Sequence, residues 1–597
     1  MKLGSKPCQI AAFVAVCVAF YRQIGSVLSH RKQSKITQVN SNKLTVPSKL
    51  PARDRRDSTP NSALFAWLGR VNRVDLVAWL ILAMILALVL ATDLRSPEKD
   101  DVAWLLYVAR KWLAGQHLYS DLVEVNPPLI IWLYAVPAWI ATTLSVPPKW
   151  VAVPSFAALV LGAAWWTASV LHRRAEIFAR RVPVFSLIGS ILLILPGVEF
   201  GQREHLMVAT LLPYLAAMAI WMQGGSLSRR HEIIIGVVAG LGCALKPTFA
   251  IALVLPEIYG WLRGRPILRP APFAGAAAAL IYAGCIVLFC PAYLDRAVPL
   301  ALALYGGTDT PLPALIDSAS SLLLGIVVLC LIWSACYRRR SIQLSASKRP
   351  LVDALFVVLT CFAAGATIAY FIAGKDWFYH RIPAIVAIVL ALVLWGVEGL
   401  PAMIRASTRD TRRRGFACAI LASLALVDFA HGQVQLMRPW IAQAVEPSLS
   451  TEVRLEKIIR HEHARTYLAF SEWIGLGFPV VDNTGVVWTS RFDSMWALRG
   501  ELWRARHDGR DPKAWPIRKW VANDFVKGCP DIVVVDSRSG INFVGVLVAS
   551  DATFAKAWTH YHEIAAFDGL RVLKRQSADC SPGKSLPRVA SMAFPTP

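Results

Sequence analysis

The segment EKDDVAWLLYVARKWLAGQHLYSDLVEVNPPLIIWLYAVPA, residues 98–138, follows one of the most apolar stretches of the chain. It combines acidic residues, an amphipathic run and a proline pair beside a sequence apolar enough to enter a lipid bilayer. Because acidic side chains are costly inside a membrane, they are expected at its surface. The segment therefore predicts a loop at the membrane surface that carries several carboxylates.

The composition of the whole chain is that of a membrane protein. Of the 597 residues, 55% are hydrophobic and only 17% are charged, which is too apolar for a soluble globular chain of this length. The formal net charge of +24 is interpreted as the excess of Lys and Arg in cytoplasmic loops, and not as a nucleic-acid-binding surface. The 11 cysteines show no spacing typical of a zinc site.

Apolar windows divide the chain into three regions. Residues 1–70 are basic and polar after a short apolar run, and we expect a largely disordered cytoplasmic tail. Residues 71–432 are expected to form a helical membrane domain with about 11 crossings and an external loop at 93–127. Its apolar windows are 74–92, 128–145, 150–171, 183–197, 204–222, 233–262, 271–290, 317–336, 351–373, 383–399 and 415–432.

Arginine-rich loops predict the orientation of these windows. The basic segments are 172–181, 228–232, 263–270, 337–350 and 405–414, and all five are expected in the cytoplasm. Window 128–145 then does not cross completely, and window 233–262 crosses twice, with a break at Lys246-Pro247. In the alternative topology each of these windows crosses once, which places 172–181 and 228–232 outside.

Residues 433–597 have ordinary polar content and are expected to form a soluble, extracytoplasmic α/β domain. The segments FPVVDN (478–483), PDIVVVD (530–536) and GLRVLKR (569–575) are predicted strands. Cys529 and Cys580 are the cysteines of this region, and a disulfide between them is expected in an oxidising compartment.

The predicted outer face collects polar residues from distant parts of the chain. A lysine inside an apolar run, such as Lys246, is costly and usually functional. Carboxylates opposite several cations suit chemistry on a lipid-linked phosphate. The acidic and amide candidates are Asp100, Asp101, Asp121, Glu124, Asn126 and Glu204, and the basic candidates are Arg203, His205, Lys246, Lys375, His380 and Arg381.

Structural explanations exist for most of these residues. Ser96 and Pro97 suit the start of a helix, where Asp100 and Asp101 would favour the positive helix end. Arg203 and Glu204 suit a solvated pair of little energetic value. The segment 375–381 suits an aromatic belt at the membrane surface.

The first loop resembles that of GT-C membrane glycosyltransferases, the class of protein O-mannosyltransferases and the lipid A aminoarabinose transferase. The similar residues are DDVAWLLYVARKWLAGQHLYSDLVEVNPPL, with GQREHLMV, GLGCALKPTF and WFYHRIP similar to later external motifs of a bacterial branch. The resemblance covers residues 74–432 and extends to VVDNTGVVWTSRFDSMW in the tail domain. It implies a GT-C-like fold, a polyprenyl-phosphate sugar donor and an extracytoplasmic glycan, lipid or protein acceptor at a bacterial inner membrane.

By position in the resembling motif, Asp101 corresponds to the catalytic carboxylate, with Asp100 as the second candidate. The family's glutamate after this aspartate is replaced by Val102, and the lysine that follows the later acid, here Glu124, is absent. Phosphate binding is therefore assigned to Arg203, His205, Lys246, Lys375, His380 and Arg381, and the acceptor to Asp121, Asn126 and Glu204. Glu124 either assists the acceptor or holds a divalent metal; no other cofactor is expected.

Other functions fit parts of the pattern. A lipid-linked oligosaccharide polymerase or ligase would use the same outer face with a longer donor. A transporter or flippase is expected to show internal repeats and acids in the middle of apolar windows, and the sequence shows neither. A non-catalytic scaffold with a partner-binding tail domain is the third alternative.

Overall fold

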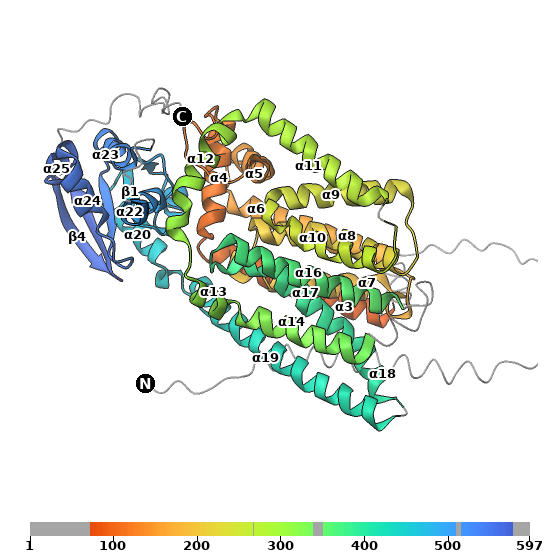
Figure 1. The fold of residues 1–597 in the computed structure, drawn as a ribbon. Coiled ribbons are helices and arrows are strands. Elements are labelled where there is room, and N and C mark those ends of the chain that lie inside the picture. The colour runs from red at the N-terminus through yellow and green to blue at the C-terminus, as the bar shows by residue number, and fades with distance from the viewer. Residues whose placement is uncertain (1–71, 267, 338–349, 407, 509–514, 577–597) are drawn as a thin grey trace, which may run out of the picture.

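The computed structural model describes residues 72–266, 268–337, 350–406, 408–508 and 515–576. The tail expected at residues 1–70 lies outside this part of the chain. The described residues form a bundle of long helices with a small α/β unit at one end (Figure 1).

Within the described residues, seven helices are long and apolar enough to cross a membrane, in agreement with the predicted polytopic membrane protein. They are α3 (Arg73–Arg95), α6 (Lys149–Leu171), α8 (Arg203–Met222), α11 (Pro270–Phe289), α16 (Leu351–Ala373), the segment Phe378–Ile404, and α19 (Arg409–Val445). The segment Phe378–Ile404 contains η8 (Phe378–Arg381), α17 (Ile382–Leu394), η9 (Trp395–Gly399) and α18 (Leu400–Ile404).

Further helices complete the bundle. A bent pair, α13 (Leu312–Ser318) and α14 (Ser320–Ile332), turns by 58° and together qualifies as one more span. Shorter helices are α5 (Pro128–Leu144), α7 (Arg181–Ile194), α9 (Arg229–Leu245), α10 (Ile251–Leu262) and α12 (Val298–Leu304). Connecting turns are η1 (Glu176–Phe178), η2 (Gly197–Glu199), η3 (Pro247–Ala250), η4 (Tyr293–Ala297), η5 (Tyr305–Thr308) and η6 (Trp333–Tyr337). The number of crossings, about 11, stays a prediction.

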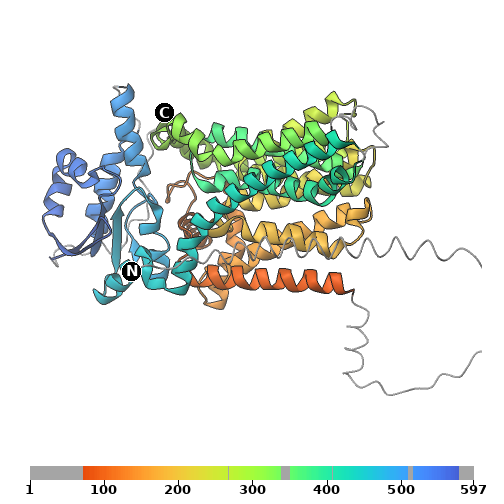
Figure 2. The same ribbon diagram turned by 90° about the horizontal axis from the view of Figure 1, so that it is seen from below.

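Contacts at the helix ends show which loops share an end of the bundle. Arg180 Nη1 lies 3.5 Å from Asp75 Oδ2 at the start of α3, whereas Lys149 Nζ at the start of α6 donates to Ser96 O at the end of α3 (2.9 Å). The loop 172–181 therefore lies opposite the loop 93–127. Figure 2 shows α3, coloured red to orange, starting at the end away from the α/β unit.

Two further contacts show where the other basic loops of this region lie, while the side of the membrane stays a prediction. Trp166 contacts His231 (Nε1–Nε2, 2.8 Å), and Arg265 lies over the Trp221 ring (5.7 Å to its centroid). The basic segments 172–181, 228–232 and 263–270 thus lie at the same end. Arginine-rich loops that are separate in the sequence are therefore neighbours in the folded protein.

The expected helix start at Ser96 and Pro97 is wrong. The amphipathic helix α4 runs from Asp100 to Leu113, and its N-cap is Lys99. Ser96 instead ends α3: its N–H bonds to Thr92 O, and its carbonyl accepts from Lys149. Because its backbone is committed to the preceding helix, Ser96 does not cap the next one.

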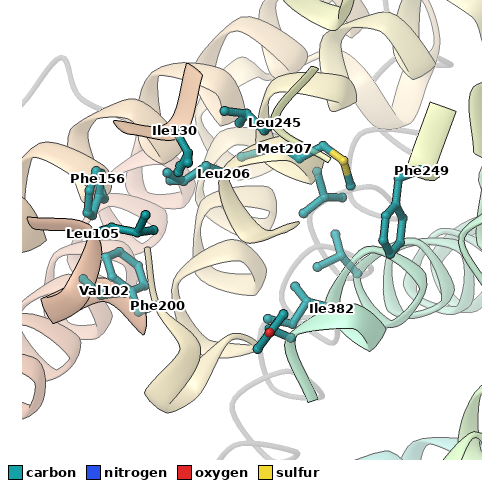
Figure 3. Close-up of a cluster of buried hydrophobic side chains, with 14 of the residues drawn as sticks. Val102, Leu105, Ile130, Phe156, Phe200, Leu206, Met207, Leu245, Phe249 and Ile382 are labelled. Atoms are coloured by element: carbon teal, nitrogen blue, oxygen red, sulfur yellow. The ribbon is translucent and has the colours of Figure 1, made fainter. Parts of the chain in front are cut away.

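The apolar face of α4 is buried in the protein. Residues 102–109 are all buried, and Figure 3 shows Val102 and Leu105 beside Phe156 of α6 and Phe200 of the α7–α8 connection. The core continues through Leu206 and Met207 of α8 to Leu245 and Phe249 at the α9–η3 junction. Burial of this face, at about 25 cal/mol per Å² of apolar surface, fixes the helix that carries the first acids.

The predicted break at Lys246-Pro247 is confirmed. Helix α9 ends at Leu245, Lys246 adopts a non-helical conformation (φ −147°, ψ 85°), and η3 begins at Pro247. Helix α9 packs directly on the backbone of α11: a Cβ at Gly236 would lie 2.1 Å from Ala271 O, and one at Gly240 would lie 2.2 Å from Gly275 O. These glycines permit the close approach that positions the end of α9.

The C-terminal α/β unit follows α19 and contains a five-stranded sheet in the order β2-β1-β3-β5-β4. Strand β1 pairs in parallel with β2 and β3, while β5 is antiparallel to β3 and β4. The strands are β1 (Thr466–Phe470), β2 (Val487–Trp488), β3 (Ile532–Asp536), β4 (Tyr561–Phe567) and β5 (Leu570–Arg575). The helices are η10 (Pro447–Leu449), α20 (Thr451–His461), η11 (Ile474–Leu476), α21 (Val480–Thr484), α22 (Trp496–Asp508), α23 (Ile517–Gly528), α24 (Phe543–Ser550) and α25 (Ala552–Trp558).

Two of the three predicted strands are confirmed as β3 and β5. The third, at 478–483, is wrong, because this segment enters the short helix α21, which Gly485 ends in a left-handed conformation (φ 75°). An apolar run of four residues does not distinguish a strand from a helical turn. The expected domain boundary at 432 falls within α19, which continues to Val445. Cys529 is buried at the end of α23, and its predicted disulfide partner Cys580 lies outside the described residues.

Candidate functional site

Charged residues from four separate segments meet at the end of the bundle nearest the α/β unit. Asp101 begins α4, Arg203 and Glu204 begin α8, Lys246 lies at the α9–η3 break, and His380 lies in η8. Asp101 interacts electrostatically with Arg203, and Lys246 interacts with both Arg203 and Asp101. The structure thus brings together the carboxylate and three of the cationic candidates.

The start of α4 holds two carboxylates in different environments. Asp100 Oδ1 accepts from the Asp101 N–H (2.8 Å) and lies 3.0 Å from Lys99 Nζ, while Trp473 Nε1 donates to Asp100 Oδ2 (2.9 Å). Both oxygens of Asp100 are therefore engaged. Asp101 Oδ2 accepts from Gln202 Nε2 (3.0 Å), and its Oδ1 has no hydrogen bond within the described residues.

Burial, reinforced by the neighbouring Asp100 carboxylate, raises the pKa of Asp101 above its ordinary value. A carboxylate with a raised pKa is a stronger base than an exposed one, and a general base works best when its pKa is near the working pH. Lys99 and Arg203 act in the opposite direction and favour the ionised form. Asp101 is thus the less constrained and chemically more available of the two acids.

Glu124 is fixed in place and 2% exposed. Its Oε2 accepts from Trp104 Nε1 (2.5 Å), and its Oε1 accepts from the Asn126 N–H (2.6 Å). Asn126 Oδ1 in turn accepts from Arg203 Nη1. Burial raises the pKa of Glu124. Glu124 and Asn126 therefore orient Arg203 from the first loop.

Glu204 is the central anion of the cationic group. It is 0% exposed, and its Oε1 lies 3.4 Å from both Lys246 Nζ and His380 Nε2. Lys246 Nζ and His380 Nε2 are 3.3 Å apart. Arg203 is also buried, at 5% exposure, so the interpretation of Arg203 and Glu204 as a solvated pair is wrong. The group is a desolvated cluster in which removal of one charge affects the others.

Four predicted site residues do not join this cluster. His205 contacts the Gly201 N–H (3.1 Å) and Leu192 O (2.9 Å), so its ring faces α7. Arg381 Nη1 donates to Ser318 O (2.7 Å) at the end of α13. Asp121 Oδ2 accepts from the His117 N–H (2.7 Å) and closes a turn. These three side chains are used by local structure.

Lys375 is the fourth. It is buried and pairs with Asp309, and it also donates to Thr308 Oγ1 (2.7 Å) and Tyr305 O (2.8 Å). Its ammonium lies 4.7 Å from the centroid of the Tyr305 ring. Lys375 therefore holds the turn η5 against the site and has no hydrogen-bond donor left over for a phosphate.

Several residues near the site were not expected from the sequence. Lys99 joins Asp100 to Glu199 (3.3 Å from Glu199 Oε1), and Gln202 bridges Glu199 and Asp101. Trp473 approaches Asp100 from the α/β unit, 373 positions along the chain. Lys99 and Gln202 are common polar residues next to predicted site residues. Their position in the predicted outer loops was the feature of the sequence that could have indicated them. Nothing local marks Trp473.

No constellation of three or more His, Cys, Asp and Glu side chains in the described part of the chain is arranged to hold a metal ion. Because both Glu124 oxygens accept hydrogen bonds, that side chain is occupied as an orienting group. The chemistry that the arrangement offers is a partly free carboxylate opposite an arginine and a lysine.

Comparisons with known proteins give a structural similarity but no matching family model. No family model matches the chain, and no curated protein matches it. Among solved structures, the chain is similar to the archaeal oligosaccharyltransferase AglB from Archaeoglobus fulgidus in complex with an inhibitory peptide and a dolichol-phosphate. The identity is 12%, the match covers 81% of this chain and 72% of that chain, and the TM-score is 0.40.

Proposed function

We propose that this chain is a membrane glycosyltransferase that moves a sugar from a polyprenyl-phosphate donor to an extracytoplasmic acceptor. Two features support the proposal: the resemblance of the first loop to that of GT-C enzymes, and the approach of Asp101 to Arg203 and Lys246. The second carries more weight, because it brings Asp101 into electrostatic contact with two cations that follow it by about 100 residues or more in the chain. The acceptor is a glycan, lipid or protein of the cell envelope.

In the proposed reaction the acceptor hydroxyl attacks the anomeric carbon opposite the phosphate. The bond from that carbon to the phosphate oxygen breaks, its electron pair leaves with the polyprenyl phosphate, and the hydroxyl proton moves to Asp101. Arg203 and Lys246 stabilise the negative charge that develops on the phosphate. A single displacement of this kind inverts the anomeric configuration. His380 sits beside Lys246 and extends the phosphate-binding side.

Asp101 is preferred over Asp100 as the base. Asp100 is held by Lys99, Trp473 and the Asp101 N–H, so both of its oxygens are already engaged in contacts within the protein. Asp101 keeps one oxygen outside the hydrogen bonds of the described residues. Glu124, Asn126 and Glu204 orient the cations rather than take part in proton transfer.

The membrane orientation follows the basic loops. With segments 172–181, 228–232 and 263–270 in the cytoplasm, the site and the α/β unit lie outside a bacterial inner membrane, and the chain enters α3 from the cytoplasm. This side is where acceptors of the cell envelope are found. The oligosaccharide polymerase and the flippase remain the alternatives that the test below separates from a sugar transferase.

The test is consumption of short-chain polyprenyl-phosphate sugars by the purified protein. Asp101→Asn is expected to lower turnover about a hundredfold, the contribution typical of a general base. Asp75→Asn is the matched control, because Asp75 is also an acid in the first turn of a helix but lies at the other end of the bundle. Undiminished turnover in Asp101→Asn would refute the assigned base, and no donor consumption by the unaltered protein would refute the transferase.

A further inference from the structure

The α/β unit sends one loop, residues 489–495, into the neighbourhood of the acids. Arg491 O accepts from the Val123 N–H (3.0 Å), directly beside Glu124 in the first loop. The Arg491 side chain is held by Asp524 (Nη2–Oδ1, 2.7 Å). The loop is thus fastened both to its own unit and to the membrane domain.

The rest of this loop is equally constrained. Trp488 Nε1 donates to Phe492 O (2.8 Å), and the Met495 N–H donates to Ser471 O (2.7 Å). Phe492, Ser494 and Met495 are all buried, whereas Asp493 between them keeps an exposed part. Within 492–495, Asp493 is therefore the one residue that its surroundings do not cover completely.

Hydrogen bonds fix the orientation of the Asp493 carboxyl group. Its Oδ1 accepts from the Ser494 N–H (2.6 Å), and Trp496 provides a further side-chain hydrogen bond. Among the described residues no ion pair neutralises it. The charged groups that act on its carboxyl group most strongly are the carboxyl groups of Glu124 and Asp101.

The same place contains aromatic surface. Trp496 contacts the ring of Tyr305 (centroids 5.4 Å apart, interplanar angle 81°), and Tyr305 interacts electrostatically with Arg203, Asp101, Asp493 and Glu124. Tyr305 is only partly buried. An aromatic face next to a fixed carboxyl group is a combination suited to a hydroxyl-rich, apolar-faced ligand such as a sugar ring.

We propose that Asp493 binds the acceptor, and that this acceptor presents hydroxyl groups and no negative charge beside the reacting hydroxyl. The inference rests on the proposed transferase function and names the acceptor side of that site. Asp493 holds a neighbouring hydroxyl while Asp101 takes the proton of the attacking one. The α/β unit thereby completes the site of the membrane domain.

Charge explains the exclusion of anions. The carboxyl groups of Asp101 and Glu124 act on Asp493, and a negative charge of the acceptor beside these two acids is repelled. Burial, with the Glu124 carboxyl group nearby, raises the pKa of Asp493 to about 8. A proton held near neutral pH lets this group donate a hydrogen bond to an acceptor oxygen as well as accept one.

The experiment uses the full-length purified protein with a short-chain polyprenyl-phosphate sugar that it consumes. The probes are n-octyl β-glucoside as a neutral acceptor and n-octyl β-glucuronide as its acidic counterpart. Donor turnover in the unaltered protein is expected to rise with the glucoside and not with the glucuronide. Asp493→Asn is expected to raise the acceptor KM about tenfold and to leave hydrolysis of the donor by water within about twofold.

Two variants separate binding from folding. Asp482→Asn is the matched control, because Asp482 also faces α4 from the α/β unit but pairs with Arg110; it is expected to lower thermal stability without raising the acceptor KM. Asp493→Glu restores a carboxyl group and is expected to recover the acceptor KM, even if Asp493→Asn melts at a lower temperature.

Failure of this inference and failure of the proposed function give different results. An acceptor KM unchanged in Asp493→Asn, equal use of both octyl glycosides, or no stimulation by either would overturn the inference while donor hydrolysis persists. Absence of any donor consumption by the unaltered protein would instead remove the proposed function itself.

Discussion

Lys246→Met is the perturbation that best tests the buried charge cluster. The change keeps an unbranched side chain that is one atom shorter and removes the ammonium that lies 3.4 Å from Glu204 Oε1. At an effective dielectric constant of about 20, two unit charges at this separation attract by about 5 kcal/mol. Because Glu204 is 0% exposed and would lose its main counter-charge, we expect a net loss of about 3–5 kcal/mol of stability.

The double variant Lys246→Met with Glu204→Gln gives the sharper result. It removes both charges, so the penalty of an uncompensated buried carboxylate disappears, and at least about 2 kcal/mol of the loss should return. Thermal unfolding of the detergent-purified variants, followed by near-UV circular dichroism, ranks their stabilities. Lys457→Met, at an exposed lysine of α20, should melt like the unaltered protein. A double variant as unstable as the sum of the two single variants would refute the coupling.

Three further predictions concern neighbouring groups. Burial raises the pKa of Glu199 to about 7. Because the folded state then keeps a proton that the unfolded state releases, the free energy of unfolding should fall by up to about 3 kcal/mol between pH 4.5 and 7. Glu199→Gln should flatten that part of a profile of melting temperature against pH. Trp473→Phe keeps a ring but removes the hydrogen bond to Asp100, and about tenfold lower donor turnover is expected; full activity would show that this contact is dispensable. His117 and Glu176 are both exposed and lie at opposite ends of the bundle. In a protein without other reactive cysteines, an impermeant thiol reagent should label His117→Cys from outside and Glu176→Cys only after the membrane is opened. The reverse labelling pattern would contradict the proposed orientation.

Local chemistry made part of the fold predictable. A lysine followed by proline inside an apolar window predicted the break at Lys246, because both residues oppose a continuous span. The apolar run IVVV of β3 and the mixed apolar and basic segment LRVLKR of β5 predicted strands. The strand β1 was missed because its segment, TYLAF, follows a helix end without a turn signal, and the run at 480–484 became a helix because Gly485 supplies a helix-ending conformation.

The charged residues of the candidate site could be predicted from the sequence, but the residues that contact them could not. Asp101, Arg203 and Lys246 could be placed at one end of the bundle from loop positions and arginine distribution. His205 and Arg381 had the same signals, yet nearby carbonyl groups use their donors. The approach of Trp473 and Asp493 depends on how the α/β unit packs against α4, and such long-range contacts leave no trace in a single sequence.

The close packing of α9 on α11 has a genetic consequence. Any side chain at Gly236 or Gly240 would push the two helices apart, and the displacement would be felt where α9 ends, at the ammonium of Lys246. In a screen for loss of function, substitutions at these two glycines would have the same phenotype as substitutions at the charged residues beyond the end of α9. A classification based only on the distance to the reacting groups would wrongly predict that these glycine substitutions have no effect.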